Sequence, residues 1–118
     1  MPIHHDAHEW LIQARRGVIE LCVLLVVSHH PCYGYDLVSR LSQWEPLAVT
    51  EGTLYPLLHR LQKEGYLVAE WQESEAGPPR KYYRLTEAGA HVLQAMTTDW
   101  ERLASAVTAL QHQEERES

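Results

Sequence analysis

The sequence predicts a mainly α-helical fold with a small β-hairpin, namely a winged helix-turn-helix followed by a long C-terminal helix. Two features lead to this prediction. Apolar residues recur at helical spacing in the segments before Gly65, and they alternate at the two-residue spacing of strands just after it. From Thr86 onward the helical spacing returns. This order of elements is that of a winged helix-turn-helix with an appended arm.

Length and composition fit one domain. The chain has 118 residues, of which 45% are hydrophobic and 22% charged. Its longest apolar run, residues 18–27, contains Glu20 and is too short to span a bilayer. The N-terminus lacks the features of a signal peptide, and Cys22 and Cys32 do not make a disulfide framework. We therefore expect a cytoplasmic protein with reduced thiols and no membrane partner.

A first helix is expected from about residue 7 to residue 29. Residues 18–27 are apolar on nearly every side of a helix, so they should lie at the centre of the fold. His30 and Pro31 end this helix, because a proline disfavours helical geometry in the residue before it.

A shorter second helix is expected over residues 34–43, and residues 44–49 form a connection. Thr50 is then the expected N-cap of a third helix, because its hydroxyl can accept a hydrogen bond from a free backbone N–H. Gly65 is placed to end that helix. Pro56 lies near its start, where a missing N–H costs least. One stripe of the third helix is apolar and consists of Leu54, Leu57, Leu58 and Leu61.

A hairpin is expected after Gly65. Leu67, Ala69 and Trp71 alternate with more polar neighbours, as in a strand. Residues 75–79 form the turn, and residues 81–85 have the aromatic content of a return strand.

The third helix has a second face with different chemistry. It presents side chains that can donate to phosphates and base edges, and a helix of this width fits the major groove of DNA. The alternative is a solvated face on a core helix. The order of elements favours DNA, because a short helix, a turn and a two-stranded ribbon surround this helix. The face consists of Gly52, Tyr55, His59 and Lys63, with Thr53 and Arg60 at its margins.

The tip of the ribbon is expected to be a stiff loop, residues 77–81, that carries Arg80 and Lys81. A wing of this kind can lie along the DNA backbone or reach into the minor groove, whose negative potential attracts cations. The alternative is an exposed turn with incidental charges.

The net charge of −6 opposes a nucleic-acid partner, since domains that bind nucleic acid are usually basic. The charge is unevenly placed, however. Residues 1–49 carry 3 Lys/Arg and 5 Asp/Glu, residues 50–84 carry 5 of each, and residues 85–118 carry 2 and 6. Phosphate contact depends on local cations, so the neutral middle third weakens the objection.

The last helix has a heptad seam, whose natural use is to pack against another helix. We expect a homodimer, because in a monomer this arm would leave an apolar stripe in water. The alternative is packing onto the first helix of the same chain. The expected division is a DNA-binding unit at residues 1–86 and a dimerisation helix at residues 87–118. The seam consists of Leu93, Met96, Trp100, Leu103, Val107 and Leu110.

These residues resemble the PadR family of bacterial transcriptional regulators, in its compact branch with a single C-terminal helix. The resemblance covers about residues 11 to 110 and lies in four segments: RG at 16–17 before the apolar helix, YGYDL at 33–37, EGTLYPLLHRL at 51–61 and GPPRKYYRLTEAG at 77–89. The chain departs from the family at His59, where Arg or Lys is frequent.

The resemblance implies repression by a homodimer on a palindromic operator, with the third helix in the major groove and the wing on the flanking backbone. It also implies dimerisation through the first and last helices. The residues expected to contact double-stranded DNA are Tyr35, Thr50, Gly52, Thr53, Tyr55, His59, Arg60, Lys63, Arg80 and Lys81.

Some compact relatives bind flat aromatic molecules between their subunits, stacked on a tryptophan of the last helix. Trp100 matches that position, and the resemblance implies a planar aromatic effector. The alternative is that Trp100 only fills the seam. The residues expected to surround such a ligand are Leu11, Ala14, Val18, Met96 and Trp100.

Two other classes of function compete with this interpretation. An enzyme is not expected, since no phosphate loop, nucleophile elbow or paired-carboxylate motif occurs. No metal or cofactor is expected: His4 and His8 have the spacing of a helical zinc pair, but no further ligand lies at a suitable spacing. A winged helix that binds proteins rather than DNA is the second alternative. The acidic balance favours it, and the Arg80–Lys81 wing and the polar face of the third helix oppose it.

Overall fold

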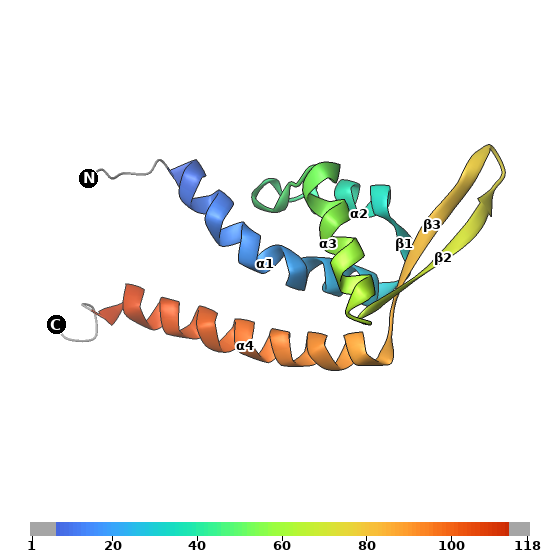
Figure 1. Ribbon diagram of the computed structural model, residues 1–118. Helices are drawn as coiled ribbons and strands as arrows, with labels where there is room; N and C mark the ends of the chain where they lie inside the picture. Colours follow the sequence, from blue (N-terminus) through green and yellow to red (C-terminus); the bar gives the residue numbers. More distant parts are fainter. Residues whose placement is uncertain (1–6, 114–118) are drawn as a thin grey trace.

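A computed structural model describes residues 7–113, and His4 therefore lies outside the described residues. Helices and a small antiparallel sheet alternate as the sequence predicts (Figure 1). The elements are α1 (Ala7–His29), β1 (Cys32–Tyr33), α2 (Gly34–Leu41), the 3-10 helix η1 (Glu45–Leu47), α3 (Glu51–Lys63), β2 (Leu67–Ser74), β3 (Gly77–Leu85) and α4 (Glu87–Gln111).

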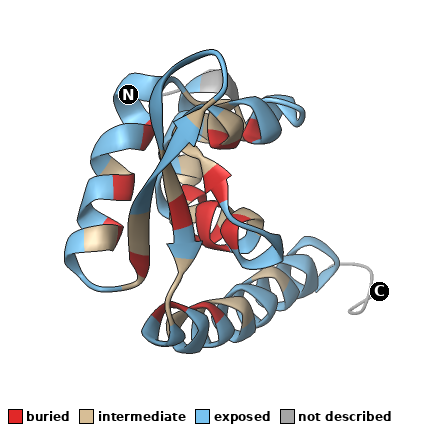
Figure 2. Ribbon diagram, turned by 90° about the vertical axis from the view of Figure 1, so that its right-hand side faces the viewer, coloured by how far each residue is buried: buried red, intermediate tan, exposed pale blue. Residues whose placement is uncertain are grey.

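The core lies where α1, α2, α3 and the base of the sheet meet, and Figure 2 shows the buried residues gathered there. Residues 18–27 supply the central helix with Val23 and Leu24 fully buried, but the prediction that nearly every side is buried is wrong at Leu25, which is 36% exposed. Leu54, Leu58 and Leu61 bury the predicted stripe of α3, while Leu57 is only partly buried. The wing and the far half of α4 project away from this core (Figure 1).

The sheet has three strands in the order β1–β3–β2, so the ribbon has one strand more than the predicted hairpin. Strand β1 pairs Cys32 with Tyr83 and Tyr33 with Tyr82. It was not predicted, because two residues are too few to show an alternation. Its pairing anchors the base of the wing beside the start of α2.

The second helix is shorter than predicted. It ends at Leu41 rather than at residue 43, and η1 occupies part of the expected connection. Pro56 also lies deeper than expected, as the sixth residue of α3. Its missing N–H therefore costs the bond to the carbonyl of Gly52, which a residue in the first turn would not lose.

Helices α3 and α4 begin with the same threonine cap. The Thr50 hydroxyl accepts from the backbone N–H of Thr53 at 3.3 Å, and the Thr86 hydroxyl accepts from that of Gly89 at 2.9 Å. Thr86 also donates from its hydroxyl to the Gly65 carbonyl at 2.6 Å. A side chain at Gly89 would overlap the backbone carbonyl of Tyr66, so α4 is seated directly on the corner between α3 and β2.

Candidate nucleic-acid interface

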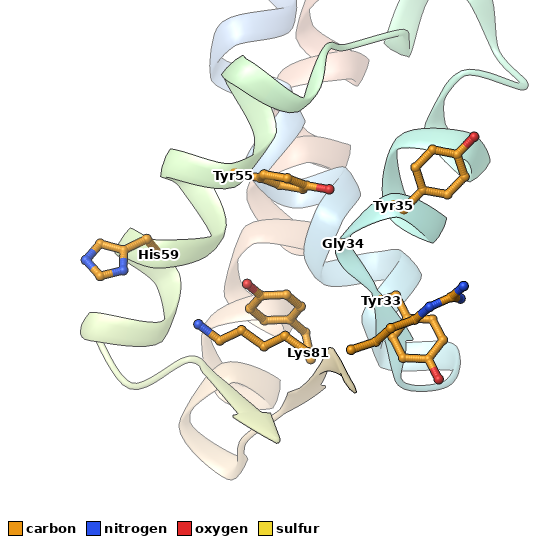
Figure 3. Close-up of a pocket in the computed structure, with 8 residues that line it drawn as sticks. Tyr33, Gly34, Tyr35, Tyr55, His59 and Lys81 are labelled. Atoms are coloured by element: carbon orange, nitrogen blue, oxygen red, sulfur yellow. The ribbon is translucent and has the colours of Figure 1, made fainter. Parts of the chain in front are cut away.

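A hollow of about 560 Å³ opens between the start of α2, the outer face of α3 and strand β3 (Figure 3). It joins two regions that the sequence predicts to contact DNA separately, the polar face of α3 and the cations of the wing. Its lining residues are Tyr33, Gly34, Tyr35, Tyr55, His59, Arg80, Lys81 and Tyr83.

The position of the Tyr55 ring depends on Gly34. A Cβ atom at residue 34 would lie 2.9 Å from Cε1 of Tyr55, so only glycine lets the ring lie against the start of α2. Figure 3 shows Tyr55 reaching from α3 toward α2. The ring is 42% exposed, and its hydroxyl points toward the start of α2. Tyr55 is therefore held where it can donate to a bound group.

Aromatic rings hold the two cations in the middle of β3. The Arg80 guanidinium carbon lies 5.0 Å from the centroid of the Tyr33 ring, which itself packs edge-on against Tyr82 at 4.1 Å. Lys81 Nζ lies 5.7 Å from the Tyr83 ring. Both cations are within the range of cation–π attraction, which limits the positions they sample.

The prediction that Arg80 and Lys81 lie in a loop at the tip is wrong. Both belong to β3, where Arg80 pairs with Gln72 and Lys81 with Trp71. The turn lies at residues 75–76, beyond a bulge in the ribbon. The cations therefore face the hollow from its wall, while the tip carries Glu75.

Burial raises the pKa of two tyrosines around the hollow. For Tyr55 the Glu51 carboxylate adds to the effect, and for Tyr83 the neighbouring Tyr55 does. Both phenols therefore stay protonated well above neutral pH and keep an O–H donor. The same hollow thus offers neutral donors beside two cations, a combination suited to phosphate oxygens and base edges.

The outer face of α3 is exposed as predicted at Gly52, Tyr55, His59 and Lys63. Only Tyr55 and His59 of this group line the hollow. Thr50 and Thr53 lie instead at the start of α3, beside a second hollow of about 350 Å³ that Arg15 and Arg16 also line.

Arg60 is engaged elsewhere. One of its nitrogens lies 3.0 Å from Glu20 of α1, and the other lies 3.0 Å from Glu64, one turn further along α3. With two carboxylates on one guanidinium, the local charge is negative. In this geometry the side chain joins α3 to α1, and its contact with DNA stays a prediction.

Comparison with known proteins agrees with this architecture. The model of the "Transcriptional regulator PadR-like family" matches residues 23–95. The chain belongs to this family. It is 37% identical to the Transcriptional regulator Rv3488 of Mycobacterium tuberculosis, over 79% of this chain and 85% of that protein.

Solved structures of PadR-like regulators share the fold. A PadR family transcriptional regulator from Eggerthella lenta superposes with a TM-score of 0.79 at 36% identity, over 87% of this chain and 89% of that chain. A PadR-like transcriptional regulator from Bacillus cereus superposes with a TM-score of 0.76 at 37% identity, over 83% of this chain and 95% of that chain. Membership confirms the predicted winged helix-turn-helix and the prediction that the chain is a transcriptional regulator and not an enzyme.

This PadR-like regulator also has a groove of about 370 Å³ between α1 and α4, separate from the two hollows described above. Four of the five residues expected around an aromatic ligand line it, and Leu11 does not. Its mouth is apolar and open, since Trp100 is 44% exposed. The lining residues are Ala14, Gly17, Val18, Leu21, Met96, Asp99, Trp100 and Leu103.

The predicted seam of α4 divides into two parts. Leu93 is buried in the core of its own chain, and Met96 packs against that core. From Trp100 onward the seam is exposed, and the exposed fraction of Leu110 is 69%. The alternative of packing onto α1 thus describes the first turns of α4, and the outer turns leave an apolar stripe uncovered by the described chain.

Among the described residues, no helix is long and apolar enough to cross a membrane, and no group of three or more potential ligands is placed to hold a metal. Cys22 and Cys32 are free thiols. Burial, reinforced by Asp36, raises the pKa of Cys32 to about 11, so this thiol is inert at neutral pH.

Sequence reasoning missed three residues of the hollow, namely Tyr33, Gly34 and Tyr83. The density of tyrosines in the segments 33–35 and 82–83 is the signal that could have found them. Their roles follow from contacts between distant segments, which spacing along one helix or strand does not reveal.

Proposed function

We propose that this PadR-like regulator represses transcription by binding a palindromic operator as a homodimer. Helix α3 enters the major groove, and the part of the wing that carries Arg80 and Lys81 contacts the flanking backbone. The observation that carries the proposal is that Tyr55 and His59 of α3 and the two cations of β3 line one hollow. A concave surface with neutral donors and cations fits a DNA backbone beside a groove.

The homodimer supplies the second α3 that a palindrome requires. The outer turns of α4 support it, because an apolar stripe of this kind is stable when a second copy covers it. The proposed dimer interface consists of the groove between α1 and α4 and the exposed part of the seam. The exposed seam residues are Trp100, Leu103, Val107 and Leu110.

A planar aromatic effector is proposed for the groove between α1 and α4. Trp100 offers an exposed ring face, and Val18, Leu21 and Met96 offer apolar walls. Such a ligand would bind where the two copies meet and release the operator. If planar dyes at high concentration leave Trp100 fluorescence unchanged, this part of the proposal fails.

A mobility-shift titration on the DNA upstream of the chain's own gene tests the proposal at two salt concentrations. Arg80→Ala/Lys81→Ala should weaken binding and flatten its salt dependence, since each cation that meets a phosphate releases counterions. Arg84→Ala is the matched control. It removes a cation from the same strand, but one that pairs with Glu70 at 2.7 Å and lies outside the hollow.

Absence of selective binding even at low salt would refute operator recognition and favour a protein partner. An equal loss in Arg84→Ala and in the double variant would mean that overall charge, not the hollow, holds the DNA.

A further inference from the structure

The side chain of Trp71 lies on the wing, beyond the part of the sheet that covers the core. It is 70% exposed, although Leu67 and Ala69 on the same strand face are buried or partly buried. The face that is apolar in the core thus continues outward and ends in an indole in solvent.

The register of the ribbon shows which way this indole faces. Trp71 is paired with Lys81, and Ala69 is paired with Tyr83. Residues directly opposite each other in antiparallel strands share a face of the sheet. Since Lys81 and Tyr83 line the hollow, Trp71 lies on the same side of the wing, one step further from the core.

The charge of the ribbon changes beyond the next pair, Gln72–Arg80. Glu73 and Glu75 occupy the tip, where phosphates would repel them, and no cation lies between residues 73 and 79. The Trp71–Lys81 pair and the neighbouring Gln72–Arg80 pair are therefore the outermost positions on the ribbon that suit a nucleic acid. A single exposed tryptophan is ordinary on a protein surface. Trp71 differs because it lies beside Lys81, which lines the proposed DNA-binding hollow.

We propose that Trp71 is a DNA contact, and that its indole packs against the deoxyribose edge that borders the minor groove beside the site of α3. This inference rests on the proposed operator binding and adds an apolar contact to it. Proteins that reach this groove often use apolar side chains there. Contacts to sugar position the protein without reading sequence. Trp71 thus strengthens binding to any duplex alike.

The test uses the full chain with its operator duplex and a scrambled duplex. Trp71→Ala should weaken binding to both about tenfold, which corresponds to about 1.4 kcal/mol. The slope of affinity against salt should stay the same, because no ion is removed. Trp71→Phe should recover most of the loss. Equal thermal unfolding of these variants shows that the fold is intact.

Trp44→Ala is the matched control. This tryptophan is also well exposed, at 57%, but it lies with His29 and Arg40 beside a different hollow. Its replacement should leave DNA affinity unchanged. If Trp71→Ala binds like the unmodified chain, or weakens only the operator, the inference is refuted.

Quenching by acrylamide gives a second measurement. The part of the emission that disappears in Trp71→Phe should be shielded when duplex is added, and no shielding would overturn the contact. A chain that binds no duplex at all would refute the proposed function as well. Normal binding without a role for Trp71 would refute this inference alone.

Discussion

Gly34→Ala tests whether DNA binding depends on the position of the Tyr55 ring. The new methyl group would lie 2.9 Å from Cε1 of Tyr55. Carbon atoms rest at about 3.5 to 4.0 Å, so the ring must move by about 0.6 to 1 Å. Because the ring is partly exposed, it can swing outward without disturbing the core. Alanine is also the better helix former by about 1 kcal/mol, so the free energy of unfolding should change little.

Binding should respond more strongly than stability. Movement at the ring is amplified at the hydroxyl, which then misses its acceptor on the DNA. One lost hydrogen bond costs about 0.5 to 1.5 kcal/mol, which predicts an affinity about 2- to 12-fold lower. Fluorescence anisotropy with a labelled operator duplex measures the affinity, and urea unfolding measures the stability.

A double-mutant cycle supplies the control. In a Tyr55→Ala background there is no ring to displace, so Gly34→Ala should have no further effect on affinity. If Gly34→Ala weakens binding equally in both backgrounds, it acts through the backbone of α2 and the reasoning is wrong. Unchanged affinity in the single variant would refute it as well.

Three further predictions follow from the geometry. Gly89→Ala should destabilise the fold by more than about 3 kcal/mol in thermal unfolding, because its methyl group would overlap the rigid Tyr66 carbonyl. If the stability is unchanged, α4 does not pack against Tyr66 as described. Since the pKa of Cys32 is raised to about 11, its contribution to stability is complete below pH 9 and is lost as the pH rises through 11. Urea unfolding between pH 8 and 11 should show a decline of roughly 2 kcal/mol that Cys32→Ala lessens, and equal declines would contradict the assignment. Glu73→Gln/Glu75→Gln should raise DNA affinity about 2- to 3-fold at low salt and not at high salt, whereas no change would mean that the tip lies far from DNA.

The helices could be predicted because their signals are local. Leucine spacing in α3, the threonine caps and the apolar run of α1 each lie within one element. The wing was mispredicted because Gly77, Pro78 and Pro79 are typical turn residues. They are tolerated in β3 because β1 pairs only with Tyr82 and Tyr83, so β3 has a single partner at its outer end.

The site was predictable in its residue types and less so in its arrangement. The exposed face of α3 follows from helical spacing alone. The engagement of Arg60 does not, since Glu20 lies 40 residues earlier in the chain. The dependence of Tyr55 on Gly34 likewise joins two helices whose relative position only the packed core determines.

The ion pairs also explain how an acidic chain can meet DNA. Arg60 is neutralised by Glu20 and Glu64, and Arg84 by Glu70, so these cations add little to phosphate binding. In the described chain, the interface retains Lys63, Arg80 and Lys81 without an ion pair.

A count of these cations sets the expected salt dependence. Each neutralised phosphate contributes about −0.9 to the slope of log affinity against log salt, so three cations per copy give a slope of about −5 for the proposed dimer. Most of the affinity must then come from neutral donors such as Tyr55 and from apolar contact. If the measured slope is about −7 or steeper, further cations must meet phosphates: either Arg60 leaves its carboxylates and opens the contact between α3 and α1, or Arg15 and Arg16 reach the DNA from the start of α3.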